Sequence, residues 1–269
     1  MADAFFTTPT TAVILAAGLG SRLQTVFATA PKGLLPLAGK SLMARSLDRL
    51  QAAGMRHVIV VIGYRADDYR RFFAEHLPDA ELIENPHFAR SGSMHSLYLA
   101  RERVPDDFLL LESDLLYEQR ALNDLLVGRA RDCLLLSGPT GQGDEVYAYV
   151  APAENRLCLL AKNPPSSAGA PAGEFVGITR MSRELLSAMC GHYEAHGPLP
   201  NSMHYDDCLS DLSRVWPIQC HKIDDLLWGE VDDPQHLERV QMRLLPTMEN
   251  SRDAACSAQP GLFSSPPPP

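Results

Sequence analysis

An apolar run that breaks into a glycine turn near the N-terminus constrains the fold of this chain most. Residues 11–17 are apolar or β-branched, and Gly18 and Gly20 follow them. Glycine has no Cβ, so its backbone can take a positive φ and bring N–H groups close to an anion. Arg22 and Lys32 add positive charge behind the turn, and a guanidinium fork with a compact ammonium suits a polyphosphate. The stretch therefore predicts a buried strand followed by a phosphate-binding loop.

Two common nucleotide-binding motifs are absent from this stretch. It has neither the Gly-x-x-x-x-Gly-Lys-Ser/Thr of a P-loop nor the Gly-x-Gly-x-x-Gly of a dinucleotide-binding turn. Gly18 and Gly20 by themselves would also fit a strand-to-helix connection in which glycine is needed only for close packing. That is the commoner role of glycine in such connections. The two cations behind the turn favour phosphate binding over that alternative.

Strand and helix patterns alternate through the first half of the chain. After residues 11–17, strand patterns occur at 57–62, 81–83 and 108–112, and helical patterns at 41–53, 67–76 and 93–103. Such alternation predicts an open, mostly parallel, doubly wound α/β sheet, in which ligands bind at the carboxyl ends of the strands. The glycine loop and residues 112–114 both follow strands, so we expect them on the same rim.

The second half of the chain has shorter strands separated by turns. Strand patterns occur at 133–137, 145–150, 157–160, 175–179 and 218–223, and helical patterns at 182–194, 206–214 and 234–244. We expect one domain over residues 1–246, with a nucleotide-binding half at about 10–130. The half at 131–246 is expected to extend the sheet with mixed strands and to bind the second substrate. Residues 247–269, which end in four prolines, are expected to be a disordered tail.

Composition excludes several classes of function. The 269 residues are 45% hydrophobic, which is enough for a sizeable core. A net charge of −9 argues against nucleic-acid binding and against a basic membrane-binding face. No apolar run reaches membrane-spanning length, and the N-terminus lacks a signal-peptide pattern, so we expect a cytoplasmic protein without membrane insertion. The oligomeric state is left open, a homodimer included.

Cysteine and histidine spacing gives no sign of a transition-metal site. The six cysteines include no Cys-x-x-Cys pair, which argues against structural zinc. Five histidines were considered as ligands and are expected to have structural or surface roles instead: His95, His192, His196, His204 and His221.

Carboxylates stand at the ends of two segments that are far apart in the sequence. The strand at 108–112 runs into Asp114, and Asp232 follows Glu230 with the spacing that puts both on one face of a strand. Carboxylate oxygens are the ligands that Mg²⁺ prefers, usually together with substrate phosphates and waters. Asp114 and Asp232 are therefore metal-ligand candidates, with solvated strand-end acids as the alternative. Asp233 precedes Pro234 and is interpreted as a helix cap.

Four blocks in order resemble a known family. They are 15–22 with Pro31-Lys32, 84–97, 112–114 and 228–233. The glycine loop is similar to that of nucleotidyltransferases that join an NTP to a phosphorylated small molecule. The four blocks together resemble the cytidylyltransferases that act on phosphocholine and on 2-aminoethylphosphonate, and the phosphonate branch is the closer match. The resemblance covers roughly residues 10–245.

This resemblance implies a nucleotidyltransferase (GT-A-like) fold with a small β-rich extension, and a Mg²⁺-dependent reaction. CTP and 2-aminoethylphosphonate would give CMP-2-aminoethylphosphonate and diphosphate, in phosphonate biosynthesis. Asp114 and Asp232 would hold the Mg²⁺, Arg22 and Lys32 would neutralise the triphosphate, and Lys162 would pair with the phosphonate. The residues implied to hold CTP are Leu15, Ala16, Ala17, Gly18, Gly20, Ser21, Ser91, Ser93, Met94 and Ser96.

The second substrate would carry a cationic amine, which acids and aromatic rings can bind. The candidates are Asp144, Glu145, Glu174, Tyr205, Asp206 and Asp207, with Trp228 as a weaker one. An acid-rich set suits a primary ammonium, which donates three hydrogen bonds, whereas trimethylammonium donates none. We therefore rank aminoethylphosphonate above phosphocholine.

Two further alternatives stay open. A sugar-1-phosphate nucleotidyltransferase shares the glycine loop and would prefer UTP, GTP or dTTP. A regulatory or scaffold module on the same fold would bind nucleotide without turnover. The presence of both Asp114 and Asp232 beside Arg22 and Lys32 counts against the binding-only alternative.

Overall fold

The computed structural model describes residues 8–20, 22, 30–143 and 145–250. Within them the strands are β1 (Thr11–Ala16), β2 (Pro36–Leu37), β3 (Lys40–Ser41), β4 (His57–Ile62), β5 (Glu81–Glu84), β6 (Phe108–Glu112), β7 (Leu115–Tyr117), β8 (Cys133–Ser137), β9 (Tyr147–Ala151), β10 (Arg156–Ala161), β11 (Gly173–Met181), β12 (Gln219–Ile223) and β13 (Trp228–Glu230). The α-helices are α1 (Leu42–Ala52), α2 (Ala66–His76), α3 (Ser93–Ala100), α4 (Arg120–Val127), α5 (Arg183–Ala195), α6 (Tyr205–Leu212), α7 (Pro234–Arg239) and α8 (Leu245–Asn250). Short 3₁₀ turns occupy Lys32–Leu34 and Ser166–Ala168.

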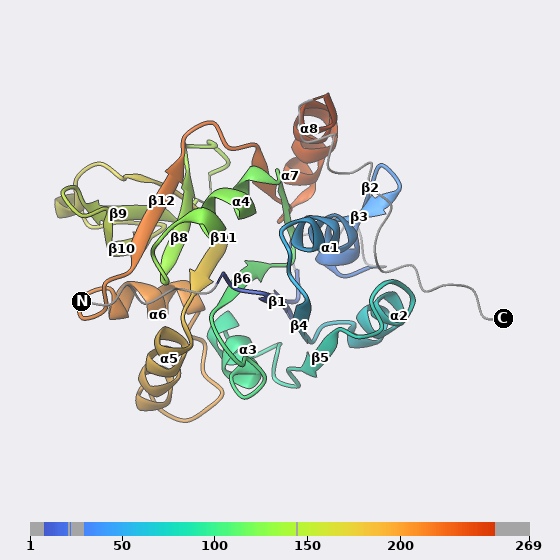
Figure 1. The fold of residues 1–269 in the computed structure, drawn as a ribbon, viewed down its shortest axis with the longest axis horizontal. Coiled ribbons are helices and arrows are strands. Elements are labelled where there is room, and N and C mark those ends of the chain that lie inside the picture. Colours follow the sequence, from blue (N-terminus) through green and yellow to red (C-terminus); the bar gives the residue numbers. More distant parts are fainter. Residues whose placement is uncertain (1–7, 21, 23–29, 144, 251–269) are drawn as a thin grey trace.

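One mixed sheet forms the centre of the molecule (Figure 1). Among the described residues its strand order is β5-β4-β1-β6-β11-β8-β12-β10-β9. β5, β4, β1 and β6 are parallel, with Val13 of β1 opposite Ile59 on one side and Leu110 on the other. Such strands form because continuous runs of Val, Ile and Leu can be buried on both faces of a sheet. The parallel sheet predicted for the first half is confirmed.

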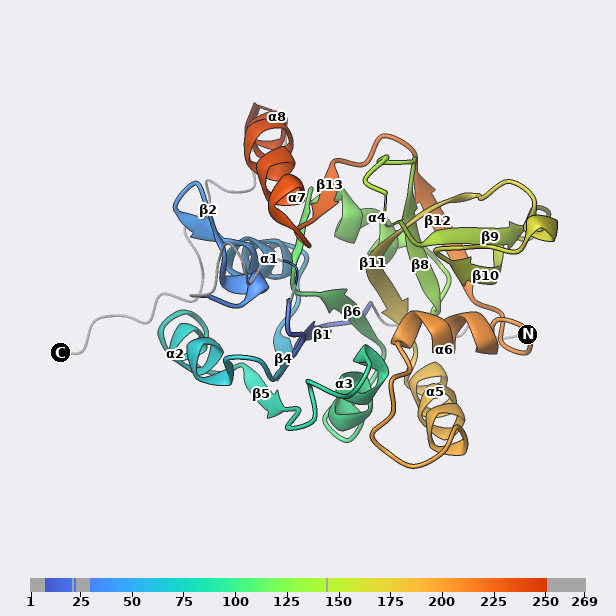
Figure 2. The same ribbon diagram turned by 180° about the vertical axis from the view of Figure 1, so that it is seen from behind.

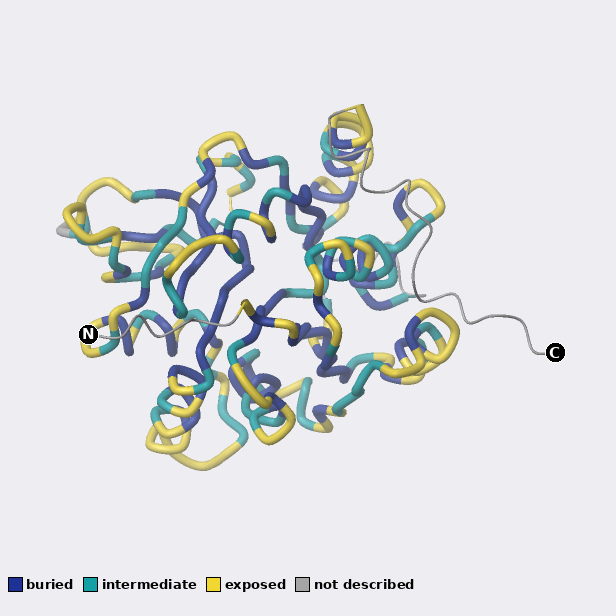
Figure 3. The backbone as a smooth tube through the Cα atoms, in the orientation of Figure 1, coloured by how far each residue is buried: buried dark blue, intermediate teal, exposed yellow. Residues whose placement is uncertain are grey.

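Helices cover both faces of this sheet. Ala12 and Ile14 of β1 face a core with α1, α2 and α4, whereas Val13 and Leu15 face a second core with α3, α5 and α6. Figures 1 and 2 show α3, α5 and α6 grouped along one side of the strands. The burial pattern in Figure 3 follows this arrangement, since the central strands are buried. The prediction of a doubly wound α/β fold is confirmed.

The second half extends the sheet through β11. This strand runs antiparallel to both β6 and β8, and β12 then lies parallel to β8. β10 and β9 complete the edge as an antiparallel pair. The predicted mixed extension is therefore present. It joins the parallel half of the sheet through the pairing of β11 with β6.

Three helices begin at a residue whose side chain caps them, and the predicted cap at Asp233 is confirmed. The Ser41 hydroxyl accepts from the Ala44 N–H at 3.1 Å, and the Ser182 hydroxyl accepts from the Leu185 N–H at 3.0 Å. The Asp233 carboxylate accepts from the N–H groups of residues 235 and 236, both at 2.8 Å, directly before Pro234. Each cap satisfies backbone donors that the first turn of a helix leaves unpaired.

The chain remains helical beyond the expected end of the domain. A π-helical segment at Val240–Leu244 follows α7, and α8 then continues to Asn250. Residues 247–250 were expected in the disordered tail, and that expectation is wrong. Pro246 lacks an N–H and would break a regular helix, but the wider π turn before it changes the hydrogen-bond pattern and lets the helix pass. Residues 251–269 of the expected tail lie outside the described residues.

Two short strands join distant parts of the chain beside the sheet. β13 pairs antiparallel with β7, so that Trp228 is opposite Tyr117 and Glu230 is opposite Leu115. Leu116 and Val231 are buried there, in a small core shared with α7 and α8. This pairing brings the segment that contains Asp232 next to the segment that contains Asp114. In the part of the chain that the structure describes, no helix is long and apolar enough to cross a membrane.

Candidate active site

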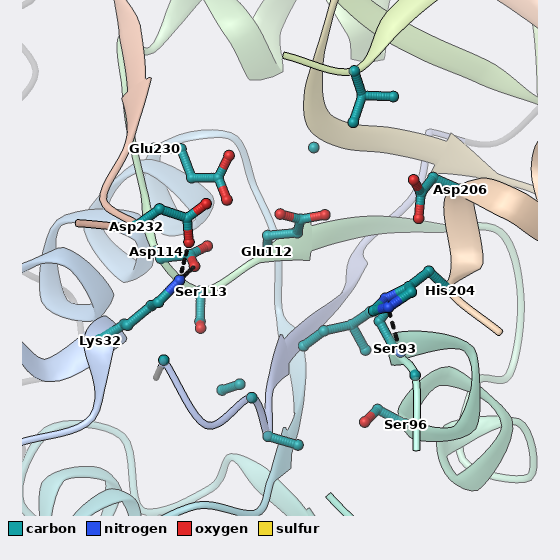
Figure 4. A pocket seen from close by; sticks show the side chains of 18 of the residues that line it. Lys32, Ser93, Ser96, Glu112, Ser113, Asp114, His204, Asp206, Glu230 and Asp232 are labelled. Atoms are coloured by element: carbon teal, nitrogen blue, oxygen red, sulfur yellow. Dashed lines mark hydrogen bonds and ion pairs between the residues drawn. The ribbon is translucent and has the colours of Figure 1, made fainter. Parts of the chain in front are cut away.

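A pocket of about 670 Å³ opens at the carboxyl ends of β1 and β6, within the size range of small-molecule sites. The glycine loop lines one side and the β11 region lines the other. Figure 4 shows Lys32, Asp114, Glu230 and Asp232 close together, with His204 and Asp206 across the pocket. The glycine loop and the carboxylates after β6 therefore share one rim, as the strand order predicts.

Gly20 makes room for the lysine of the site. Its φ is +59°, a backbone conformation that side chains other than glycine rarely adopt. A Cβ at this position would lie 2.9 Å from Cγ of Lys32. The glycine thus lets the Lys32 side chain run alongside the loop and reach the carboxylates beyond it.

Lys32 joins the two carboxylates that the sequence analysis singled out. Its Nζ donates to Oδ2 of Asp114 at 3.2 Å and to Oδ1 of Asp232, and Nη2 of Arg22 donates to Oδ2 of Asp232 at 2.6 Å. The main chains also meet, because the N–H of Val231 donates to the carbonyl of Asp114 at 3.0 Å. Residues 200 positions apart are therefore held in direct contact.

Burial and charge shift the pKa values of these groups in opposite directions. Burial would lower the pKa of Lys32, but the charges of Asp114 and Asp232 outweigh it and raise that pKa. For Asp232, burial favours the neutral acid, yet the charge of Lys32 and hydrogen bonds from Glu230 and Lys32 bring its pKa down to about 2. Burial raises the pKa of Asp114, and Lys32 only partly offsets this. Lys32 and Asp232 are therefore a charged pair at neutral pH.

Two more carboxyl groups complete the cluster. Oxygens of Glu112, Asp114 and Glu230 all lie within 4.8 Å of one another. Burial and the charge of Asp114 raise the pKa of Glu112 to about 8, although the Tyr205 hydroxyl donates to it at 2.6 Å. Burial and the neighbouring acids raise the pKa of Glu230 well above its usual value. Lys32 and Arg22 bring two positive charges to these four acids.

The donor set of this cluster fits a hard divalent cation. Its ligand atoms are carboxylate oxygens, which Mg²⁺ selects, and the described part of the cluster has no imidazole or thiol that would favour a softer metal. Burial, and after it the charges of neighbouring acids, raises the pKa of Glu112 and of Glu230, and a divalent cation beside them would favour their charged forms. Asp114 and Asp232 are the ligands that the sequence predicts, and Glu112 and Glu230 are additions from the structure.

Asn85 organises the serine-rich turn at 91–96. Its side-chain amide donates to the hydroxyls of Ser91 and Ser96, both at 3.1 Å, while its carbonyl oxygen accepts from the N–H of His87 at 2.8 Å. Ser93 contacts the other side of the pocket, where its hydroxyl lies 3.2 Å from Nδ1 of His204. The serines do not cap α3, since its N-cap residue is Gly92 with no side-chain cap. Their hydroxyls therefore do not serve as ordinary helix N-caps.

We expect Asn85→Ala to weaken nucleotide binding. The change removes three hydrogen bonds that fix the turn, each contributing about 0.5–1.5 kcal/mol, so KM for the nucleotide should rise about tenfold or more while kcat changes less. Steady-state kinetics measure this. Asn123→Ala, an exposed amide on α4, is the matched control. Equal KM values for the two variants would contradict the role of Asn85.

Acids line the opposite end of the pocket. Glu174 of β11 is only 2% exposed, and its carboxylate accepts from the N–H of Thr140 at 2.7 Å and from the Thr140 hydroxyl at 2.9 Å. Burial raises the pKa of Glu174, and the bonds from Thr140 oppose the rise. Burial and Asp207 raise the pKa of Asp206, while the nearby charge of Lys162 lowers it. Carboxylates and one lysine thus share this end.

Most of the predicted site residues line the pocket, and two do not. Met94 is fully buried in the core under α3, and Tyr205 is 1% exposed behind Glu112. Neither side chain faces the pocket, so the roles assigned to them are corrected, Tyr205 being a support for Glu112. Ser21 and Asp144 lie outside the described residues. The predicted residues that line the pocket are Leu15, Ala16, Ala17, Gly18, Gly20, Arg22, Lys32, Ser91, Ser93, Ser96, Asp114, Glu145, Lys162, Glu174, Asp206, Asp207 and Asp232.

The sequence analysis missed several residues of the site. Glu112, Asn85 and Glu230 stand inside the blocks that carried the family resemblance, so those blocks were the signal for them. His204 precedes α6 and contacts Ser93 from 111 positions away, which no local pattern indicates.

Comparison with known proteins shows the family of this chain. Residues 12–196 match the family described as MobA-like NTP transferase domain. The chain is 32% identical over 239 residues to the 2-aminoethylphosphonate cytidylyltransferase of Lancefieldella rimae, covering 85% of this chain and 90% of that protein. It is 28% identical over 257 residues to the CMP-5'-(3-aminopropyl)phosphonate synthase of Streptomyces rubellomurinus, covering 91% of this chain and 40% of that protein.

The fold has solved relatives as well. The inositol-1-phosphate CTP transferase from T. maritima superposes with a TM-score of 0.77 at 20% identity, over 91% of this chain and 98% of that one. The chain spans about half the length of the first curated relatives that it matches. With the family model covering most of the domain, the chain belongs to the MobA-like NTP transferase domain family, a family of nucleotidyltransferases, as its glycine loop predicted.

Proposed function

We propose that this chain is a Mg²⁺-dependent cytidylyltransferase that transfers CMP from CTP to 2-aminoethylphosphonate. One observation carries the proposal, namely that a single pocket joins the glycine loop and its cations to an acid-lined end. The printed names of two relatives, an aminoethylphosphonate cytidylyltransferase and an aminopropylphosphonate synthase, support an aminoalkylphosphonate as the acceptor.

In the proposed reaction, a phosphonate oxygen attacks the α-phosphorus of CTP. A new P–O bond forms, the bond from the α-phosphorus to the oxygen shared with the β-phosphate breaks, and diphosphate leaves with that electron pair. The attacking oxygen is already anionic at neutral pH, so no residue has to remove a proton. Catalysis then rests on positioning and on charge neutralisation.

Different residues of the pocket would position and neutralise each of the two substrates. Arg22 and Lys32 stand where the triphosphate would lie after the glycine loop, and Lys162 would pair with the phosphonate at the far end. Asp114 and Asp232 would hold the Mg²⁺, with Glu112 and Glu230 beside them. When bound, that cation would neutralise phosphate charge.

The acids at the acceptor end favour a primary ammonium. Glu145, Glu174, Asp206 and Asp207 all line this part of the pocket, and each carboxylate can accept a hydrogen bond from an ammonium group. Glu174 is buried, so an ammonium group beside it would stabilise its charged form, because a buried carboxylate without a positive partner is costly. An inositol phosphate, whose ring carries no positive charge, would not need these acids.

Phosphocholine is the second candidate acceptor. Trp228 and Phe175 line the same pocket, and Trp228 is only 4% exposed. Aromatic faces attract a trimethylammonium through cation–π contact, which needs no hydrogen bond. The acids outnumber these rings at the acceptor end, so we rank phosphocholine second.

A panel of nucleotides and acceptors tests the proposal. We expect diphosphate release with CTP and 2-aminoethylphosphonate, with a kcat/KM at least about tenfold above that for other pairs, and loss of release when EDTA removes Mg²⁺. Faster release with phosphocholine would reverse the ranking of acceptors. A preference for UTP or dTTP with a sugar-1-phosphate would replace the proposed activity, and nucleotide binding without diphosphate release would favour a binding-only module. The proposal places the reaction in the cytoplasm, where CTP is made.

A further inference from the structure

Two histidines and an aspartate meet on the surface between α5 and α6, apart from the pocket. His192 stands on the last turn of α5, His196 is the C-cap residue four positions later, and Asp211 stands on the last turn of α6. The two helices lie side by side in both views (Figures 1 and 2). The expectation that these histidines lack metal-ligand spacing is wrong, because residues four apart lie on the same face of a helix.

The three side chains already lie near the distances that a metal needs. Nε2 of His192 is 3.1 Å from Oδ2 of Asp211, and the imidazole rings of His192 and His196 are 4.2 Å apart between centroids. One ligand atom from each residue lies within 4.8 Å of the other two. In a tetrahedral site with bonds of 2.0–2.1 Å, ligand atoms stand about 3.3 Å apart. The pair formed by His192 and Asp211 already has about this spacing, and His196 would have to come closer to complete the set.

The hydrogen bond of His196 prepares its other nitrogen as a ligand. Nδ1 of His196 lies 2.9 Å from the carbonyl oxygen of His192. A carbonyl can only accept, so Nδ1 carries the proton and Nε2 is left with its lone pair. A second nitrogen bonded to a backbone carbonyl is the usual arrangement of a metal-binding histidine. This observation is independent of the distances between the three side chains.

We propose that His192, His196 and Asp211 form a binding site for Zn²⁺, with a water as the fourth ligand. Imidazole with one carboxylate suits Zn²⁺ and related late transition metals, whereas Mg²⁺ prefers oxygen ligands alone. The site is therefore chemically different from the carboxylate cluster in the pocket, and the two ions would not compete for it. No part of this proposal depends on the reaction proposed above.

Zn²⁺ bound at this site would stabilise the segment that supports the serine-rich turn at 91–96. Residues 196–204 connect α5 to α6, and within them the carbonyls of Asn201 and Met203 accept from the N–H groups of Gly92 at 3.0 Å and Met94 at 3.2 Å. The hydroxyl of Tyr193 in α5 also accepts from the N–H of Asn201 at 3.1 Å. A metal that joins α5 to α6 would hold together the two helices that flank this connection. We expect the effect on stability rather than on the chemical step.

Zinc titration of matched variants tests the site. Zn²⁺ is added in excess Mg²⁺, which occupies the oxygen-rich pocket, in a background where two cysteines are serine: Cys158, which is exposed, and Cys256, which lies outside the described residues. We expect one zinc equivalent that His196→Gln binds at least about tenfold more weakly. His76→Gln is the control, because His76 is also exposed with Nδ1 on the carbonyl four residues before it, at 2.8 Å, and has no second histidine.

Thermal unfolding and cobalt spectra give two further readouts. Zinc at about 100 times its dissociation constant should raise the Tm of the parent chain and of His76→Gln by about 5 °C and leave His196→Gln unchanged. Co²⁺ should give the strong visible absorption of a tetrahedral site, and this should disappear in Asp211→Asn. Circular dichroism and diphosphate release without zinc verify that the variants are folded. Equal zinc affinity in His196→Gln and the parent chain, or no zinc effect on the Tm of the parent chain, would overturn the proposal.

Discussion

Replacing Asp114 by Asn is expected to abolish diphosphate release while the fold persists. Asp114 lies at the centre of the carboxylate cluster, 3.2 Å from Nζ of Lys32 and within 4.8 Å of oxygens from Glu112 and Glu230. The amide keeps the shape of the side chain and loses its charge, so a divalent cation is held far less well. Loss of several kcal/mol of transition-state stabilisation corresponds to a fall in kcat/KM of about a thousandfold or more.

Stability should not fall with this change, because burial opposes the charge of Asp114. Its pKa is raised by burial, with Lys32 only partly offsetting the rise, so the native state already disfavours the ionised form. Asn has no charge to bury, so this cost disappears. It also removes one of the negative charges that raise the pKa of Glu112. Thermal unfolding and diphosphate release, measured on the same preparation, separate loss of activity from loss of fold.

Asp233→Asn is the matched control for this experiment. It makes the same chemical change one residue from Asp232, and Asn caps a helix as well as Asp does, so the bonds to the N–H groups of residues 235 and 236 can be kept. Near-normal activity is expected. Full activity in Asp114→Asn would contradict the assignment of Asp114 as a metal ligand, whatever the control shows.

The parallel half of the sheet could be predicted because its strands are buried on both faces. β4 and β6 have the bounds that the apolar runs at 57–62 and 108–112 indicate. β7 and β13 are three residues each and have no periodicity of their own. They exist because they pair with each other across more than a hundred residues, and a local pattern carries no information about such a partner.

The site shows the same division between local and long-range information. The glycine loop, Asp114 and Asp232 stand in local blocks, and the structure brings them together around Lys32. The family resemblance assigns Met94 to CTP, and Tyr205 is predicted to contact the amine as an aromatic ring, but adjacent positions of a helix point in different directions. The raised pKa of Glu112 depends on burial, which only the packed structure reveals.

Replacing Lys32 by Met should make the stability of the protein depend on Mg²⁺. Lys32 is the cation that contacts both Asp114 and Asp232, and Met keeps its length without its charge. Removing one partner of a buried ion pair costs up to about 3–5 kcal/mol; here Asp114 loses its cation, whereas Asp232 keeps Arg22. Activity should fall by about a hundredfold or more, since a charge on the triphosphate is lost as well.

The response to Mg²⁺ distinguishes this explanation from a simple packing defect. If the carboxylates lose their cation in Lys32→Met, added Mg²⁺ should raise the Tm of the variant more than that of the parent chain, because it replaces the missing charge. EDTA, which removes the Mg²⁺, should reverse this rise in Tm. Lys40→Met is the control, since Lys40 pairs with Asp48 on the exposed surface, where such pairs contribute little. An equal Mg²⁺ shift in all three proteins would mean that the acids around Asp114 do not bind the ion, and the metal assignment would fail on stability alone, independently of any activity measurement.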